Sequence, residues 1–104
     1  MAWVLLFIAG AFETAWAIAL KQADGFTRIV PTLVFVAALV ASMVLLALAL
    51  RDLPLGTGYA VWTGTGAVGA ALAGVAFLGE SATTGRLLPI GLVAVGIVWL
   101  ALGE

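Results

Sequence analysis

Long uncharged stretches dominate this chain, and they constrain its fold more than any other feature. A helix needs about 20 apolar residues to cross roughly 30 Å of hydrocarbon. The four basic and five acidic side chains leave uncharged runs at residues 1–12, 14–20, 29–50, 53–79 and 87–103. The first two runs become one span if Glu13 lies inside it. The sequence therefore predicts an all-α integral membrane protein, a single domain over residues 1–104 with four transmembrane helices at about 2–20, 29–50, 54–78 and 86–102.

Composition excludes most soluble classes of protein. The chain is 65% hydrophobic and 9% charged, whereas a water-soluble domain is about half apolar and about a quarter charged. Cysteine and histidine are both absent, which excludes disulfides, thiol catalysis, serine–histidine catalysis and the usual zinc sites. We expect no enzyme, no catalytic residue, no metal and no cofactor. A net charge of −1 without a basic surface also argues against nucleic acid as a partner.

The connections between the predicted spans are short. We therefore expect consecutive helices to be antiparallel neighbours, with both termini on one side of the membrane. Asp24 and Gly25 are turn residues, and Asp52 followed by Pro54 resembles a helix N-cap with proline in the first turn. The continuous apolar runs lack the alternation of a membrane barrel, which argues against strands.

Basic residues specify the orientation in the membrane only weakly. Lys21, Arg28 and Arg86 fall on one side, and Arg51 falls on the side of the termini. The positive-inside rule gives this distribution a faint preference for outward termini. A chain so evenly charged is able to insert in both orientations.

The triplet at residues 15–17 imitates a signal-peptide cleavage site. The stretch before it has no lysine or arginine and contains a carboxylate, unlike a secretory signal. We therefore expect the first helix to remain in the mature protein.

Glu13 is the one ionisable residue that falls inside a predicted span. An ionised side chain at the centre of a membrane helix costs about 2.5–3.5 kcal/mol on insertion scales. A purely structural reading is a protonated glutamate that hydrogen-bonds to a neighbouring helix. The reading we favour is a cation and proton site, in which an arriving cation stabilises the carboxylate and displaces its proton. Because no lysine or arginine lies in any span, the charge partner must be a proton or a substrate.

Four further polar or aromatic residues fall at the depth of Glu13. With a helix rise of about 1.5 Å per residue, Glu13 lies about 15 Å into the membrane from Trp3, and Tyr59, Trp62 and Ser42 lie about 8–12 Å from the same side. Trp16 follows Glu13 by one helical turn. Each has a simpler interpretation, as packing tryptophans, an interfacial tyrosine and a packing serine. Their common depth favours a site with acceptors, donors and aromatic walls.

Glycines mark two further features. Gly64 and Gly66 follow Trp62 and form a point where the third helix can bend, which suits alternating access. Gly91 and Gly96 lie in an apolar fourth helix that is better suited to self-association than to a pathway. Ordinary close packing of helices is the simpler interpretation of all four.

Four helices of this size cannot easily enclose an aqueous path and also bury Glu13, so we expect at least a dimer. If two copies insert in opposite orientations, the two Glu13 carboxyls can share one cavity, and their titrations are then coupled.

Several motifs together resemble the small multidrug resistance family along essentially the whole chain. They are E-x-x-W at Glu13–Trp16, LK-x-x-x-GFTR-x-x-P at Leu20–Pro31, Ala41–Ser42, LP-x-G-x-x-YA-x-W-x-G-x-G at Leu53–Gly66, and GL-x-x-x-GIV at Gly91–Val98. Within that family, a tryptophan in the place of Trp16 is typical of the guanidinium exporter subtype, where multidrug exporters have glycine. Leu39 agrees with this, because the multidrug branch tends to have tyrosine there.

The resemblance implies an antiparallel, dual-topology homodimer in the cell inner (plasma) membrane that exports guanidinium in exchange for protons. By the same resemblance, Glu13 binds guanidinium and protons, Trp16 and Ser42 tune the carboxylate, and Tyr59 and Trp62 line the cavity. The fourth helix holds the dimer together. Pairing with a related chain stays open.

Three alternatives remain beside guanidinium export. A promiscuous exporter of quaternary ammonium or multidrug cations would also use Glu13, although Trp16 and Leu39 argue against it. A rotary proteolipid-type proton carrier places a carboxylate in mid-membrane, but as a two-helix hairpin without this aromatic cluster. A non-transporting assembly subunit is the third, and it would use Glu13 only for folding or partnering.

Overall fold

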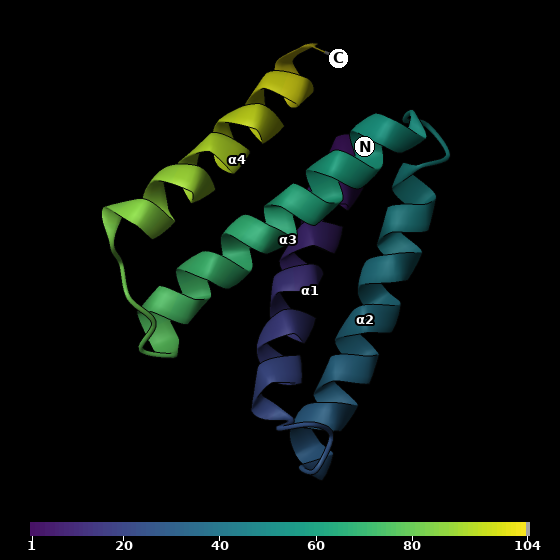
Figure 1. The fold of residues 1–104 in the computed structure, drawn as a ribbon. Coiled ribbons are helices and arrows are strands. Elements are labelled where there is room, and N and C mark those ends of the chain that lie inside the picture. The colour runs from purple at the N-terminus through teal and green to yellow at the C-terminus, as the bar shows by residue number, and fades with distance from the viewer. Residues whose placement is uncertain (104) are drawn as a thin grey trace.

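The fold consists of four long helices joined by short connections. A computed structural model describes residues 1–103, and Glu104 lies outside the described residues. The helices are α1 (Ala2–Gln22), α2 (Ile29–Ala49), α3 (Leu55–Phe77) and α4 (Thr84–Gly103) (Figure 1). Each is long and apolar enough to cross a membrane. The all-α prediction is confirmed, and no helix end differs from its predicted position by more than two residues.

The connection between α1 and α2 is a tight turn with an unusual backbone. Asp24, Gly25 and Phe26 all have positive φ, at 50°, 69° and 67°, a region that few residues other than glycine adopt readily. Thr27 donates a hydrogen bond of 2.8 Å from its Oγ1 to the Asp24 carbonyl. Turn chemistry at Asp24 and Gly25 is thereby confirmed, and it reverses the chain from α1 into α2.

The start of α3 differs from the prediction. Pro54, not Asp52, is the N-cap residue, and no side chain caps the helix. The carbonyl of Pro54 accepts the first helical hydrogen bond, from the Gly58 amide at 2.9 Å. A proline disfavours helical backbone in the residue before it, here Leu53, so the helix cannot readily extend back past Pro54. Asp52 therefore lies in the turn, outside the helix.

Helix α1 lies at the centre of the fold. It packs closely against both α2 and α3, whereas α2 and α3 make few contacts with each other. Consecutive helices are therefore in contact, as expected, but α2 and α3 meet over a much smaller area than either shares with α1. Small residues make this central position possible, because Ala9 and Gly10 are buried in α1. The start of α1 and the end of α4 lie towards the same end of the molecule, as predicted for the two termini (Figure 1).

Helix α4 stands apart from the other three. Within residues 1–103 it contacts α3 and neither α1 nor α2. Of its described residues, Ile97 alone is buried. The connection that leads into it carries an ion pair, in which the Arg86 guanidinium lies 2.8 Å from the Glu80 carboxylate. Most of the α4 surface is therefore free for contact with lipid or with another chain.

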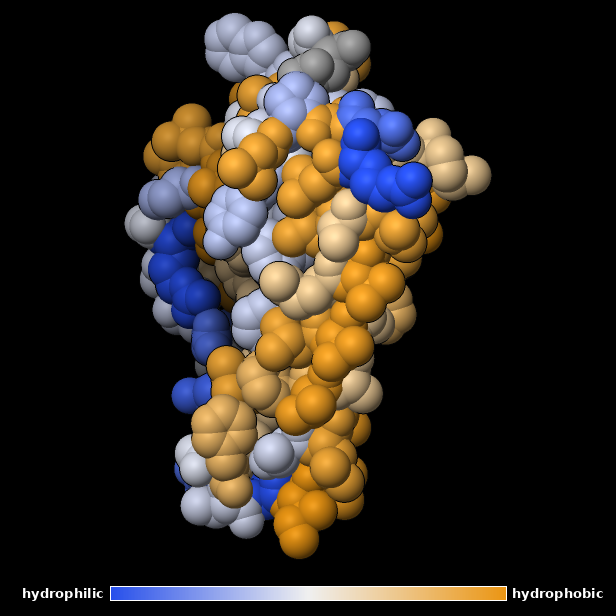
Figure 2. Space-filling model, turned by 90° about the vertical axis from the view of Figure 1, so that its right-hand side faces the viewer, coloured by the Kyte–Doolittle hydropathy of each residue, from blue (hydrophilic) through white to orange (hydrophobic). Residues whose placement is uncertain are grey.

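The outer surface of the molecule is apolar over most of its length. Figure 2 shows hydrophobic side chains covering the face in view, with hydrophilic residues gathered near the ends and along one side. Exposed valines of α2, including Val34, Val40 and Val44, belong to this outer surface. A soluble monomer rarely exposes so large an apolar area. The surface is that of a protein surrounded by hydrocarbon.

Candidate functional site

Glu13 projects from α1 onto α3 in the interior of the fold. Its side chain is 8% exposed, and it lies against Gly66, where an added Cβ atom would overlap the Glu13 carboxyl group. Gly66 therefore provides the space that the carboxyl group occupies. Within residues 1–103, the one ion pair joins Glu80 and Arg86. No basic side chain of these residues therefore neutralises Glu13.

Three helices are joined by two hydrogen bonds through Trp62, which precedes Gly66 by one turn of α3. The indole Nε1 of Trp62 on α3 donates to the Ser42 hydroxyl on α2 at 2.9 Å. The same hydroxyl donates to the Ala9 carbonyl on α1 at 2.7 Å. Ser42 and Trp62 are both buried. These two hydrogen bonds fix the indole of Trp62 one helical turn from Gly66. The bond to Ala9 uses the one proton that the Ser42 hydroxyl can donate.

Tyr59 and Trp62 form an aromatic pair at the edge of the site. Their ring centroids are 5.4 Å apart with an interplanar angle of 60°. Tyr59 is 52% exposed, so one side of this pair faces out of the single chain. The structure therefore brings three of the predicted site residues together, Tyr59 and Trp62 from α3 and Ser42 from α2.

Trp16 lies outside that group. Its ring packs edge-on against Phe35 of α2, with centroids 5.8 Å apart. Its buried indole Nε1 has no hydrogen-bond partner within the described part of the chain. Trp16 therefore contributes a donor that nothing in the single chain uses.

Sequence reasoning missed two threonines that pack between α1 and α3. Thr14 lies over Gly69, and Thr65 lies over Gly10. The Thr14 hydroxyl is 3.4 Å from the Gly10 carbonyl and 3.5 Å from the Gly66 carbonyl. The spacing of Gly66 and Gly69 offered a signal, because residues three apart share one face of a helix.

Gly64 and Gly66 are close-packing positions in this structure. A Cβ atom at Gly64 would lie 2.8 Å from Ile97 of α4. The two glycines therefore let α4 and α1 approach opposite sides of α3, which is continuous from Leu55 to Phe77. A hinge at these positions stays a prediction.

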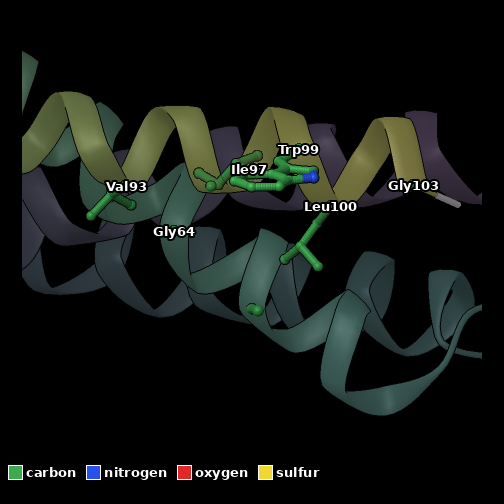
Figure 3. Close-up of a pocket in the computed structure, with 8 residues that line it drawn as sticks. Gly64, Val93, Ile97, Trp99, Leu100 and Gly103 are labelled. Atoms are coloured by element: carbon green, nitrogen blue, oxygen red, sulfur yellow. The ribbon is translucent and has the colours of Figure 1, made fainter.

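Gly91 and Gly96 have open space around them. Apart from the adjacent residues and the backbone of the same helix, no described atom lies within 4 Å of a Cβ atom built on either one. Gly96 lines an apolar groove of about 610 Å³ between α3 and α4 (Figure 3). Figure 3 shows Val93 and Leu100 of α4 pointing towards α3 along this groove. Neither glycine is needed for packing within the chain, and their role in self-association stays a prediction.

Comparison with known proteins gives a consistent result over the whole chain. Residues 1–93 match the family described as Small Multidrug Resistance protein. A protein of Citrobacter freundii named "Guanidinium exporter" is 53% identical over 98% of this chain and 97% of its own length. Proteins of the same name are 52% identical in Yersinia pseudotuberculosis, over 100% of both chains, and 51% identical in Salmonella typhi, over 98% of this chain and 97% of that one.

Proposed function

Because this chain belongs to the small multidrug resistance family, we propose that it exports guanidinium in exchange for protons. Family membership and four membrane-spanning helices make it a multi-pass protein of the inner membrane and a transporter, not an enzyme. The names of relatives about half identical to it over their full length support guanidinium as the exported cation.

The burial of Glu13 without a basic partner in the described chain is the observation that carries the proposal. A carboxylate in a poorly hydrated site needs a compensating positive charge, and without a fixed cation this charge comes from a proton or from the substrate. The two compete for one group. Release of guanidinium on one side and uptake of a proton there then become parts of the same exchange.

Guanidinium suits the groups around Glu13. It is a planar cation whose N–H donors form a fork that matches the two oxygens of a carboxylate. The faces of indole and phenol rings attract such a cation, and the Tyr59–Trp62 pair offers both. The Ser42 hydroxyl supports this role by fixing the indole of Trp62. Trp16 follows Glu13 by one turn and has an unused indole N–H, which supports the proposal that it tunes the carboxylate.

We propose further that two antiparallel copies form the complete site. The half-exposed Tyr59 and the exposed surface of α4 support this assembly. The grooves of about 610 and 420 Å³ run along α4 and are not lined by Glu13. A second chain would supply the missing wall and a second carboxyl group, while α4 with Gly91 and Gly96 would join the subunits. Alternating access would then use the predicted hinge at Gly64 and Gly66.

Proton-coupled currents distinguish guanidinium export from its alternatives. Guanidinium and a large hydrophobic quaternary ammonium cation are compared in liposomes from one reconstituted preparation. The proposal expects a proton-coupled current with guanidinium and little with the bulky cation. The reverse order would identify a promiscuous cation exporter, and the absence of both currents would favour an assembly subunit.

A further inference from the structure

The interface between α1 and α3 contains three contacts of a side chain with a glycine. Glu13 lies over Gly66 and Thr14 lies over Gly69, both from α1 onto α3, and Thr65 of α3 lies over Gly10 in return. Side chains placed over glycines bring helix backbones close together. The carbonyl groups of one helix thereby come within reach of the hydroxyl groups of the other. We refer to this interface as the threonine–glycine seam.

Within the seam, the Thr14 hydroxyl lies between two acceptors. One is the Gly10 carbonyl of its own helix at 3.4 Å, and the other is the Gly66 carbonyl of α3 at 3.5 Å. A hydroxyl donor prefers a distance of about 2.7–2.8 Å. Both bonds are therefore long, and neither acceptor holds the proton strongly.

This arrangement favours two alternative positions of α1 against α3. Because Thr14 and Gly10 belong to the same helix, a movement between these positions changes only the distance to Gly66. An approach of about 0.7 Å would bring the Gly66 carbonyl to the preferred distance, and a separation would leave the hydroxyl to turn towards the Gly10 carbonyl. Shifts of about 1–2 Å between packed helices are typical of conformational switching in proteins. The acceptor on α3 is the carbonyl of Gly66, the residue on which Glu13 lies. A movement of α3 that changes the distance from Thr14 to the Gly66 carbonyl therefore also moves the surface that the Glu13 carboxyl group contacts.

We propose that Thr14 is a positioning residue whose hydroxyl exchanges its hydrogen bond between Gly66 of α3 and Gly10 of α1 as the transporter changes conformation. The inference rests on the proposed function, since it assigns the hydroxyl to the conformational step of that transport cycle. Thr14 does not bind the substrate. It adjusts how firmly α1, and with it Glu13, is held against α3.

Matched substitutions separate the hydroxyl group from the shape of the side chain. Thr14→Val keeps the branched shape and removes the donor, and Thr14→Ser keeps the donor. We expect Thr14→Val to lower the maximal proton-coupled guanidinium current by about three- to eighteenfold, the range of interhelical hydrogen bonds in membranes. The guanidinium dissociation constant should stay within about twofold of the unmodified protein, because the contacts of the cation are unchanged. Thr14→Ser should retain both values.

Thr65 provides the control within the same seam. Its buried hydroxyl has no hydrogen-bond partner in residues 1–103, so Thr65→Val should leave the current unchanged. Equal currents for Thr14→Val and the unmodified protein would overturn the proposal, as would equal losses in Thr14→Val and Thr14→Ser. An equal loss in Thr65→Val would also contradict it. If Thr14→Val does not fold, Thr14→Ala against Thr14→Ser makes the same comparison.

A second readout does not depend on transport. The chain has no cysteine, so spin labels can be attached through Phe12→Cys and Ala67→Cys, two exposed positions beside the seam. We expect Thr14→Val to weaken the dipolar broadening between these labels and Thr14→Ser to preserve it. Unchanged broadening in Thr14→Val overturns the inference. Absence of any guanidinium current in the unmodified protein contradicts the proposed function instead, so the two failures are distinguishable.

Discussion

The carboxyl group of Glu13 lies directly over Gly66, at a position of α3 where a side chain of any size would displace it. This contact joins the one acidic residue within the described helices to the helix that also carries Trp62. The position of the carboxyl group therefore depends on a glycine 53 residues further along the chain.

Substitution of Gly66 tests whether that contact positions the carboxyl group. We expect Gly66→Ala to lower guanidinium transport by about 10- to 100-fold, because a displacement of about 1 Å of a reacting or binding group has effects of this size. Gly56→Ala is the control, since it lies on the same helix with no atom within 4 Å of the added Cβ. Transport currents of the two variants provide the measurement. Similar currents would show that Gly66 is not needed to place Glu13.

The bond between Trp62 and Ser42 should stabilise the fold as a coupled pair. Removal of either partner leaves the other buried without its bond, so Ser42→Ala and Trp62→Phe should each lower the free energy of unfolding. The double variant should lose less than the sum of the single losses, with a coupling energy of about 0.6–1.7 kcal/mol. Unfolding of the detergent-solubilised protein gives the three values. Strict additivity would contradict the coupling of the 2.9 Å bond to stability.

Competition between protons and guanidinium predicts a definite pH dependence. Since a protonated Glu13 cannot pair with a cation, lower pH should weaken the apparent affinity for guanidinium. Where protons occupy the site, displacement of one proton per cation changes the apparent affinity by about tenfold per pH unit. Guanidinium binding measured across a pH series checks the direction. An affinity that is independent of pH would contradict competition at one carboxyl group.

The open surroundings of Gly96 make it a test of self-association through α4. A Cβ atom at this position meets no atom of another helix within 4 Å, and the position opens onto the groove between α3 and α4, so Gly96→Leu should preserve the helical content of the protein. It should weaken dimerisation by about tenfold, because small residues allow close contacts of helices in membranes. Val98→Leu changes the opposite side of α4 and is the control. The monomer fraction in liposomes, counted by single-molecule photobleaching, should rise only for Gly96→Leu.

Much of the fold follows from the sequence, because the membrane restricts the available structures. Uncharged runs locate the helices, and the cost of burying a charge is enough to single out Glu13 among the nine charged residues. The central position of α1 could not be predicted in the same way. It depends on which helices have small residues in facing positions, as Gly10 and Gly66 do. Helical depth alone does not determine which faces meet.

Depth also explains why the candidate site was predicted only in part. The helix rise predicts that Ser42, Trp62 and Glu13 share a level in the membrane, and the structure places the first two in direct contact. Trp16 turns instead towards Phe35, a direction that spacing along one helix cannot reveal. Thr14 has no distinctive sequence signal, because a threonine in a membrane helix normally bonds to its own backbone. Its second acceptor belongs to another helix.

The central claim is that the carboxyl group of Glu13 carries both guanidinium and the proton. Glu13→Gln keeps the size of the side chain and removes its charge, whereas Glu13→Asp keeps the charge on a shorter side chain. The direct measurement is guanidinium-driven proton flux in liposomes containing each variant. We predict no coupled flux for Glu13→Gln and a reduced but measurable flux for Glu13→Asp. An undiminished flux in Glu13→Gln would contradict the assignment of transport to this carboxyl group.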